Sequence, residues 1–259
     1  MKKLVLLFLC SLIVSCGSGP KPKFHDNIVI AHRGAWKANS LPQNSIASLK
    51  HAVSIGAHGS EFDVHITADD SIVVNHDIDF NGMVIEKTSY SKLITEKLSN
   101  GEKLPTLREY LKEGMKQNTT KLILEIKKAG YQERMLELTR KAVELVKKMN
   151  AKKWVEYITF DYEAGKLVRQ LDRNAEIAYL TGDVSPEKAK KDGYTGLDYH
   201  FSKYKENPQW IPEAHKLGMS INAWTVNSEE DMMYMIDQNA EYITTNEPEL
   251  LLQLVGDEK

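Results

Sequence analysis

The hydrophobic positions of the chain alternate between short apolar runs and longer amphipathic stretches. Residues 28–31 form an apolar run typical of a buried strand, whereas 45–55 carries apolar residues three and four positions apart, as a helix does. Eight main strands are predicted, at 28–31, 61–66, 122–127, 155–160, 176–180, 197–201, 220–226 and 242–245. Helices are predicted between and after them, at 45–55, 106–115, 131–149, 162–171, 185–191, 208–217, 228–238 and 248–255.

This alternation is interrupted once, after the second strand. Residues 71–75 are predicted to pair with that strand as a ribbon after the Asp69-Asp70 turn, and 78–104 is predicted to be irregular and polar. Eight strand–helix units predict an α/β fold, a (β/α)8 TIM barrel with a small insertion after the second strand. The rival is a doubly wound open sheet, but Ala31-His32-Arg33-Gly34-Ala35 is not its glycine-rich phosphate turn.

Composition supports one large globular core. The chain has 259 residues, of which 42% are hydrophobic and 27% are charged, and this length suits one barrel or two small domains. The formal net charge of −2 gives no sign of a polyanion-binding surface, so nucleic acid is not expected as a partner.

The N-terminal residues have the pattern of an export segment. Lys2 and Lys3 precede an apolar stretch at 4–14 that is too short for a permanent membrane span. Ile13-Val14-Ser15-Cys16, followed by Gly17-Ser18-Gly19-Pro20, resembles a bacterial lipoprotein signal. The resemblance implies a signal peptide at 1–16 with lipidation of Cys16, so that the protein is exported and anchored to a membrane of the cell envelope. The alternative is a plain secretory peptide with an incidental cysteine.

Two further expectations follow from this N-terminus. Residues 17–26 are predicted to form a flexible tether, and 27–259 to form the barrel domain, with its insertion at about 78–104. The only cysteines are Cys10 and Cys16, so the exported domain is expected to lack disulfides and thiolate metal ligands.

Polar residues concentrate where the predicted parallel strands end, which is where barrel enzymes place their catalytic groups. The candidates are His32, Arg33, Glu61, Asp63, His76, Glu125, Lys127 and Trp224. Each has an ordinary structural interpretation: a core histidine, a solvated acidic face, an internal ion pair or a core tryptophan. Their coincidence at one end of one barrel favours a functional site, because burying so much charge is costly.

The candidate side chains suit chemistry on a phosphate ester. Glu61, Asp63 and Glu125 offer hard oxygen ligands, which favour Mg²⁺ or Ca²⁺ over Zn²⁺ without distinguishing the first two. Arg33 and Lys127 could hold an anion beside the cation. Two histidines nearby suit acid–base catalysis near neutral pH.

Together these segments resemble the glycerophosphodiester phosphodiesterase family, in order along nearly the whole predicted domain. The segments are His32-Arg33-Gly34, Leu41-Pro42-Gln43-Asn44-Ser45, Glu61-Phe62-Asp63-Val64, Val73-Val74-Asn75-His76-Asp77, Leu124-Glu125-Ile126-Lys127, Ala223-Trp224-Thr225-Val226-Asn227 and Ile243-Thr244-Thr245-Asn246-Glu247-Pro248. No single segment is decisive, but the ordered set is specific.

The resemblance implies a role for each candidate residue. His32 and His76 would be the acid–base pair, and Arg33 and Lys127 would contact the phosphate. Trp224 would shape the substrate pocket. Glu61, Asp63 and Glu125 would bind one divalent cation. The reaction implied is hydrolysis of a small glycerophosphodiester to an alcohol and glycerol 3-phosphate, through a cyclic phosphate formed by a neighbouring glycerol hydroxyl.

The chain departs from the family pattern at three positions. Gln43 stands where a glutamate is usual, which predicts a change in metal affinity or pH optimum, and Ser45 stands where threonine is usual. Asn246 stands where aspartate is commoner, and it is interpreted as structural.

Two alternative functions stay open beside hydrolysis of soluble diesters. One is a phospholipase-type action on lysophospholipid, and the other is a lipoprotein that binds glycerophosphodiesters without catalysis. The headgroup and the oligomeric state are not predicted by the sequence.

Overall fold

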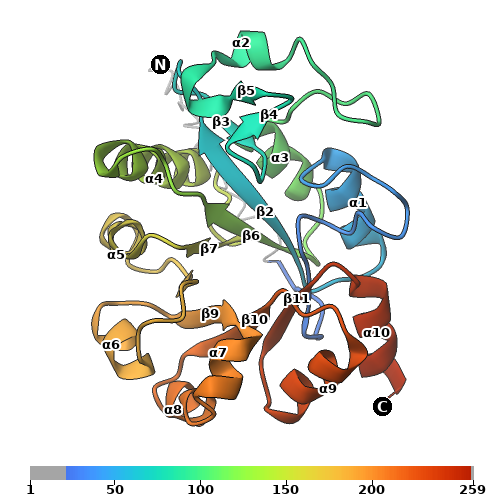
Figure 1. Cartoon of the computed structure of the whole chain (residues 1–259), viewed down its shortest axis with the longest axis vertical. Coiled ribbons are helices and arrows are strands. Elements are labelled where there is room, and N and C mark those ends of the chain that lie inside the picture. Colours follow the sequence, from blue (N-terminus) through green and yellow to red (C-terminus); the bar gives the residue numbers. More distant parts are fainter. Residues whose placement is uncertain (1–21, 258–259) are drawn as a thin grey trace, which may run out of the picture.

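The computed structural model describes residues 22–257, and eight parallel strands close into a barrel with helices around it (Figure 1). In barrel order the strands are β1 (Val29–Ala31), β2 (Gly59–Ile66), β6 (Lys121–Ile126), β7 (Val155–Thr159), β8 (Ile177–Tyr179), β9 (Gly196–His200), β10 (Ser220–Trp224) and β11 (Tyr242–Thr245). The barrel closes because β1 pairs in parallel with both β11 and β2. The predicted (β/α)8 barrel is confirmed.

The surrounding helices are α1 (Ile46–Ser54), α3 (Leu107–Gly114), α4 (Gln132–Lys148), α5 (Tyr162–Leu171), α6 (Pro186–Lys191), α7 (Phe201–Glu206), α8 (Trp210–Lys216), α9 (Glu229–Asp237) and α10 (Pro248–Asp257). Six of them, α1, α3, α5, α6, α7 and α9, begin at a residue whose side chain caps the first turn. The hydroxyls of Ser45 and Thr106 each accept a hydrogen bond from the third residue of the helix that follows. Helix α7 was not predicted, because Phe201 had been assigned to the strand. The His200 side chain instead accepts from the Ser202 amide and starts a helix there.

The insertion after β2 is more ordered than predicted. Strand β3 (Ile72–Val74) pairs antiparallel with β2, as expected for the ribbon. The stretch 78–104 is not irregular: it contains β4 (Asp79–Phe80), β5 (Met83–Val84), the 3₁₀ helix η1 (Ile85–Lys87) and α2 (Tyr90–Leu93). Its widely spaced apolar residues form a small core of their own, which consists of Val73, Phe80, Ile85, Leu93 and Leu104.

Strand alternation divides the side chains between two environments. On β6, Leu122 and Leu124 pack in the large core between the sheet and the helices. Ile123 instead joins an apolar layer inside the barrel, which consists of Ile30, Ile123, Ile158, Ala178 and Leu180. Because successive side chains of a strand point to opposite faces, Lys121 and Glu125 lie inside the barrel on either side of this layer.

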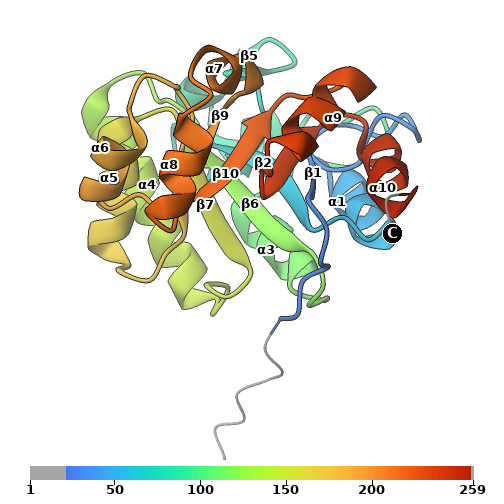
Figure 2. The ribbon, with the colours of Figure 1, turned by 90° about the horizontal axis from the view of Figure 1, so that it is seen from below.

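The described chain enters at the end of the barrel opposite to the strand C-termini (Figure 2). The amides of Lys23 and His25 donate to the carbonyls of Asn118 and Thr119, which lie three and two residues before β6. The Phe24 ring lies 6.0 Å from that of His58, between centroids. The last residues of the predicted tether are therefore attached to this end of the barrel. Residues 17–21 and Cys16 lie outside the described residues.

Between residues 22 and 257, no helix is both long enough and apolar enough to cross a membrane.

Candidate active site

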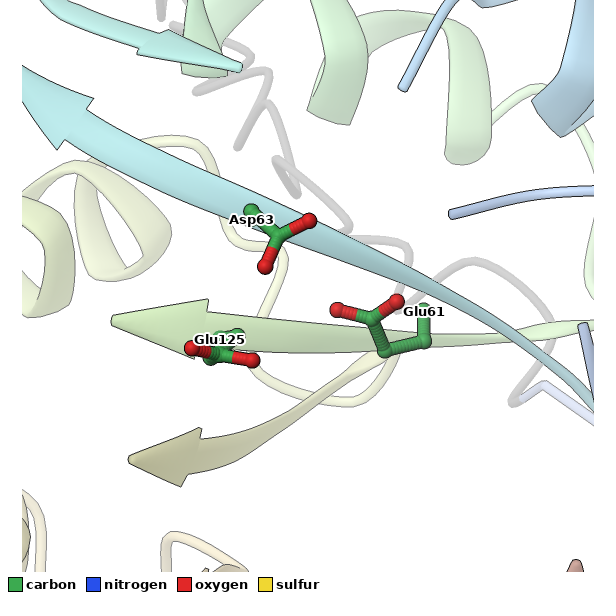
Figure 3. Close-up of side chains that lie close together, drawn as sticks. All are labelled: Glu61, Asp63 and Glu125. Atoms are coloured by element: carbon green, nitrogen blue, oxygen red, sulfur yellow. The ribbon is translucent and has the colours of Figure 1, made fainter. Parts of the chain in front are cut away.

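Three buried carboxylates occupy the C-terminal end of the barrel (Figure 3). Glu61 and Asp63 face inward from β2, while Phe62 and Val64 between and beyond them pack outward against the helices. Asp63 is the register partner of Glu125 on β6. One oxygen from each carboxylate lies within 4.8 Å of the other two, so the three side chains form a single cluster.

The donor set of this cluster fits a hard divalent cation. Glu61 Oε1 is buried and accepts no hydrogen bond from the described residues, whereas the equally buried Asp63 Oδ1 and Glu125 Oε1 share one partner, the Lys127 ammonium. Buried polar atoms are almost always paired, so an unmet oxygen beside two others that share a single ammonium indicates a missing partner. Oxygen ligands at this spacing suit Mg²⁺ or Ca²⁺. The cluster could therefore hold a metal ion.

Burial and mutual repulsion shift the pKa values of the carboxylates away from their usual range. Burial, followed by the charges of Asp63 and Glu125, raises the pKa of Glu61 well above its usual range. Burial and the Asp63 charge raise the pKa of Glu125 to about 8. Burial also acts to raise the pKa of Asp63, but the Lys127 and His76 charges outweigh it and hold that pKa below its usual value. Without a cation, Asp63 is the carboxyl that keeps its charge.

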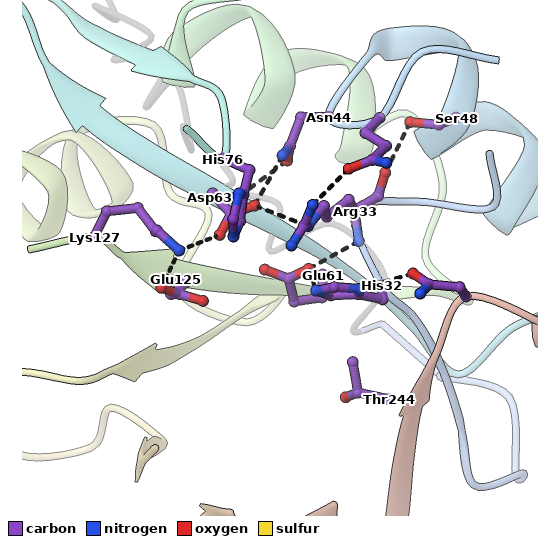
Figure 4. Close-up of polar contacts among 12 residues, drawn as sticks. His32, Arg33, Asn44, Ser48, Glu61, Asp63, His76, Glu125, Lys127 and Thr244 are labelled. Carbon is purple, nitrogen blue, oxygen red and sulfur yellow. Dashed lines mark hydrogen bonds and ion pairs between the residues drawn. The ribbon is translucent and has the colours of Figure 1, made fainter. Parts of the chain in front are cut away.

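Two cationic side chains border the cluster (Figure 4). Lys127 Nζ lies 2.9 Å from Glu125 Oε1 and 3.2 Å from Asp63 Oδ1. Arg33 Nε lies 3.9 Å from Asp63 Oδ2, on the other side. Burial disfavours the charged Lys127, but Asp63 and Glu125 more than offset this, and its pKa is raised. The two cations thus stay charged beside the carboxylates, where an anionic phosphate could bind.

The turn after β1 holds Arg33 in an unusual backbone conformation. Its φ of +58° is left-handed, which costs an L residue roughly 1–2 kcal/mol. The Arg33 amide donates to Glu61 Oε2 at 2.8 Å, and its carbonyl accepts from the Ser48 hydroxyl at 3.1 Å and the Asn44 amide at 3.0 Å. Gly34 follows with φ +79°, and a Cβ there would lie 2.5 Å from Ser48 Oγ. The glycine of His32-Arg33-Gly34 is therefore required by close packing on α1.

Gln43 and Asn44 are adjacent in the chain but contact different members of the site. Gln43 Oε1 accepts a hydrogen bond from Arg33 Nη1 at 2.6 Å. The glutamine that replaces the usual glutamate therefore affects the guanidinium, and its side chain forms no hydrogen bond with the three carboxylates in the described residues. Asn44 Nδ2 donates to Asp63 Oδ2 at 2.8 Å, and its Oδ1 accepts from the Asp63 amide at 3.1 Å. Asn44 thus fixes the orientation of one member of the carboxylate cluster.

Asn246 orients His32. The two side chains are joined between His32 Nδ1 and Asn246 Oδ1 at 2.8 Å. Since an amide oxygen only accepts, His32 donates from Nδ1, and Nε2, which lies 4.0 Å from Glu61 Oε2, is left as the acceptor. Burial and the Arg33 charge lower the pKa of His32 to about 4, so the imidazole is neutral near pH 7.

His76 and Trp224 form the outer parts of the site. His76 is partly exposed, and its Nδ1 lies 2.8 Å from Asp77 Oδ1. Trp224 Nε1 donates to the Asp198 carbonyl at 2.8 Å, and its ring meets those of Phe160 and His200 edge to face. A cavity of about 100 Å³ is lined by His32, Arg33, Glu61, His76, Glu125, Lys127, Asp198, Trp224 and Thr244, among others.

Comparison with known proteins agrees with this geometry. The model of the glycerophosphoryl diester phosphodiesterase family matches residues 32–250. The chain belongs to this family. Its members are hydrolases. The glycerophosphodiester phosphodiesterase of Caldanaerobacter subterraneus is 30% identical over 245 residues, 88% of this chain and 97% of that protein.

Solved structures of phosphodiesterases share the fold. A glycerophosphodiester phosphodiesterase from Parabacteroides distasonis superposes with a TM-score of 0.88 at 43% identity, covering 91% of this chain and 99% of that one. A phosphodiesterase from Oleispira antarctica, solved with the product sn-glycerol-3-phosphate, has a TM-score of 0.76 at 23% identity, covering 88% of this chain and 96% of that one.

The structure brings the predicted side chains of the barrel together and adds three to them. Asp63 contacts Arg33 and Lys127, and the other seven candidates line the same cavity. The sequence predicts no role for Asn44 and a structural one for Asn246, although each contacts a candidate residue. No role is predicted for Asp198. Its sequence signal is the alternation of Leu197 and Tyr199, which pack outward and place Asp198 inside.

The raised pKa of Glu125 predicts that cation binding releases protons. A divalent cation binds the ionised carboxylate, whereas the metal-free protein holds Glu125 largely protonated below its pKa of about 8. Ca²⁺ or Mg²⁺ binding at pH 7 should release about two protons per ion, one from Glu61 and one from Glu125. The affinity for the cation should rise as the pH is raised from below 8 to above it. Calorimetry in buffers of different ionisation enthalpy measures both, and Glu125→Gln should bind more weakly and release fewer protons. Binding without proton release would contradict this electrostatic account.

Proposed function

We propose that this family member hydrolyses glycerophosphodiesters to an alcohol and glycerol 3-phosphate. The observation that carries the proposal is the buried cluster of Glu61, Asp63 and Glu125, in which one oxygen is unmet and two share the Lys127 ammonium. The cation would be Mg²⁺ or Ca²⁺, held by these three carboxylates. When bound, it would supply positive charge that stabilises the developing charge on the phosphate.

Arg33 and Lys127 are positioned to hold the phosphate. Their charged groups lie on two sides of Asp63, at 3.9 Å and 3.2 Å from its oxygens. Gln43 is neutral, so it orients the Arg33 guanidinium without cancelling its charge. A phosphate between the two cations would replace contacts that they now make with carboxylates.

The two histidines would divide the proton transfers. His32 Nε2 is free to accept the proton of a glycerol hydroxyl as that oxygen attacks phosphorus, because Nδ1 is committed to Asn246. The bond from phosphorus to the other alcohol breaks, and His76 donates a proton to the leaving oxygen. Asp77 Oδ1 lies 2.8 Å from His76 Nδ1, so Asp77 can orient the His76 ring. Water then opens the cyclic phosphate with the proton transfers reversed, which restores both histidines.

The direct test is turnover of a soluble diester. The purified protein, incubated with glycerophosphocholine and Mg²⁺ or Ca²⁺, should release glycerol 3-phosphate, and EDTA should stop the release. His32→Ala and His76→Ala should each lower kcat by at least about 100-fold with the melting temperature little changed. Asn246→Ala, which removes only the partner of Nδ1, should lower kcat by less and leave KM nearly constant.

Two results would count against this assignment. Failure to turn over any glycerophosphodiester headgroup, with ligand-induced stabilisation intact, would favour a lipoprotein that binds diesters without catalysis. Near-normal rates in either histidine variant would remove that histidine from the mechanism.

One observation favours a second candidate function, hydrolysis of lysophospholipid. A groove of about 760 Å³ lies between the insertion and the loop after β6. Ile78, Val84 and Tyr131 line it, and they are the exposed large hydrophobic side chains of the described residues. Ile78 is two residues from His76, so an acyl chain in the groove would lie close to the site.

A paired substrate assay separates the two candidates. We expect glycerophosphocholine to be hydrolysed faster than lysophosphatidylcholine, because nine of the thirteen residues that line the cavity beside the carboxylates are polar or charged. Ile78→Asp should leave the glycerophosphocholine rate unchanged, since Ile78 lies outside that cavity. A faster rate on the lysolipid, selectively lost in Ile78→Asp, would support the second function instead.

We also propose that the protein is an exported lipoprotein anchored through Cys16. The support is the pattern of its first residues. Lys23 is attached at the barrel end away from the carboxylates, and seven residues of extended chain reach at most about 25 Å. The site opening would then face away from the anchoring membrane, which favours soluble substrates.

The anchor is tested by fractionation of the full-length chain. The wild-type protein should sediment with membranes, and Cys16→Ser should move to the soluble fraction while its activity persists. Equal distribution of the two proteins would exclude the lipid anchor.

A further inference from the structure

Asp198 is a buried acidic side chain that the proposed mechanism does not use. It faces the barrel interior from β9, is 1% exposed, and lines the cavity together with Glu125 and Trp224. It is not a member of the carboxylate cluster that could hold a metal ion. Trp224 Nε1 donates to the Asp198 carbonyl, which ties this position to the wall of the cavity.

The polar groups around Asp198 leave one of its oxygens without a partner. On the neighbouring strands β10 and β11, Asn222 Nδ2 donates to Thr244 Oγ1 at 2.8 Å, and the Thr244 hydroxyl lies 3.2 Å from Asn222 Oδ1. Asn222, the register partner of Asp198 on β10, also lies close enough to Asp198 for a hydrogen bond that acts to lower the Asp198 pKa. Asp198 Oδ1 is buried and has no hydrogen-bond partner among the described residues. Since Asp198 lines the cavity, a molecule in the cavity can supply that partner.

The chemistry of Asp198 selects the kind of partner. Burial, with the charges of Glu156 and Glu125, raises its pKa well above the usual range, so the side chain is a neutral carboxylic acid. A neutral acid both donates and accepts a hydrogen bond, which is also what an alcohol hydroxyl does. A second cation would instead require an ionised carboxylate.

We infer that Asp198 is a hydroxyl-binding subsite at the floor of the cavity, where it recognises a hydroxyl of the substrate's glycerol group. Thr244 lines the same cavity beside His32 and Glu61 (Figure 4), so the subsite adjoins the groups assigned to the reaction. This inference rests on the proposed function and adds a determinant of specificity to it. Asp198 would bind glycerol and would take no part in bond breaking.

The test compares two ligands that differ only in hydroxyl groups. Binding of glycerol 3-phosphate and of n-propyl phosphate, which lacks both hydroxyls, is measured by calorimetry on the cation-loaded protein. The wild type should prefer glycerol 3-phosphate by at least about 10-fold. Asp198→Ala and Asp198→Leu should reduce this preference by about 10-fold while binding n-propyl phosphate as before. Asp198→Asn keeps a donor and an acceptor and should retain most of the preference.

Several outcomes would overturn the inference. If Asp198→Ala keeps the full preference, the unmet oxygen holds a trapped water and not a substrate hydroxyl. If the alanine and leucine variants both bind the two ligands more weakly, and by the same factor, Asp198 supports only the fold of the site. Failure of the proposed function is recognised separately, because the wild type would then turn over no glycerophosphodiester, whatever the ligand preference of the variants.

Discussion

The rest of the site depends on the burial of three carboxylates within 4.8 Å of one another. Such a group is unstable in a barrel interior unless its charge is compensated or its members are protonated. The protein uses both means: Lys127 and Arg33 lie beside Asp63, and burial raises the pKa of Glu61 and Glu125. The compensation is incomplete, since Glu61 Oε1 has no hydrogen-bond partner among the described residues, while Asp63 Oδ1 and Glu125 Oε1 share one ammonium. This incompleteness is what gives the cluster its capacity for a cation.

Charge counting connects the cluster to its proposed substrate. Three ionised carboxylates with Arg33 and Lys127 carry one net negative charge, so a divalent cation would leave one net positive charge. A phosphodiester, which is a monoanion, would then make the site neutral. The neutral side chains around the cluster preserve this balance. Gln43 contacts Arg33, Asn246 contacts His32, and Asp198 is protonated, so none of the three adds a negative charge. Gln43 and Asn246 stand where the family pattern has acids, and both departures affect groups that neighbour the carboxylates.

The barrel and most of the site were predictable because they follow from periodicity and from strand ends. The two-residue spacing of Glu61 and Asp63, and of Glu125 and Lys127, places each pair on one face of its strand, and parallel strands bring the pairs together. Contacts made by loops were not predictable in this way. Asn246 contacts His32 across 214 positions of the chain, and Asn44 reaches Asp63 from a turn with left-handed backbone. The order within 78–104 was missed because its few apolar residues are too widely spaced to show a period.

The barrel interior contains two groups of charged side chains, one near each end, with an apolar layer between them. At the end where the chain enters, Lys121 lies 2.8 Å from Glu156, and the pair is compensated within the protein. The apolar layer of Ile30, Ile123, Ile158, Ala178 and Leu180 lies between this pair and the carboxylates. An apolar layer keeps water from crossing the barrel and lowers the local dielectric, so charges on its far side interact strongly. Lys121 therefore cannot compensate the negative charge of the carboxylates from the other side of the apolar layer. Their negative charge must be compensated at the C-terminal end of the strands, where residues of the loops, a cation or a substrate can supply positive charge or hydrogen bonds.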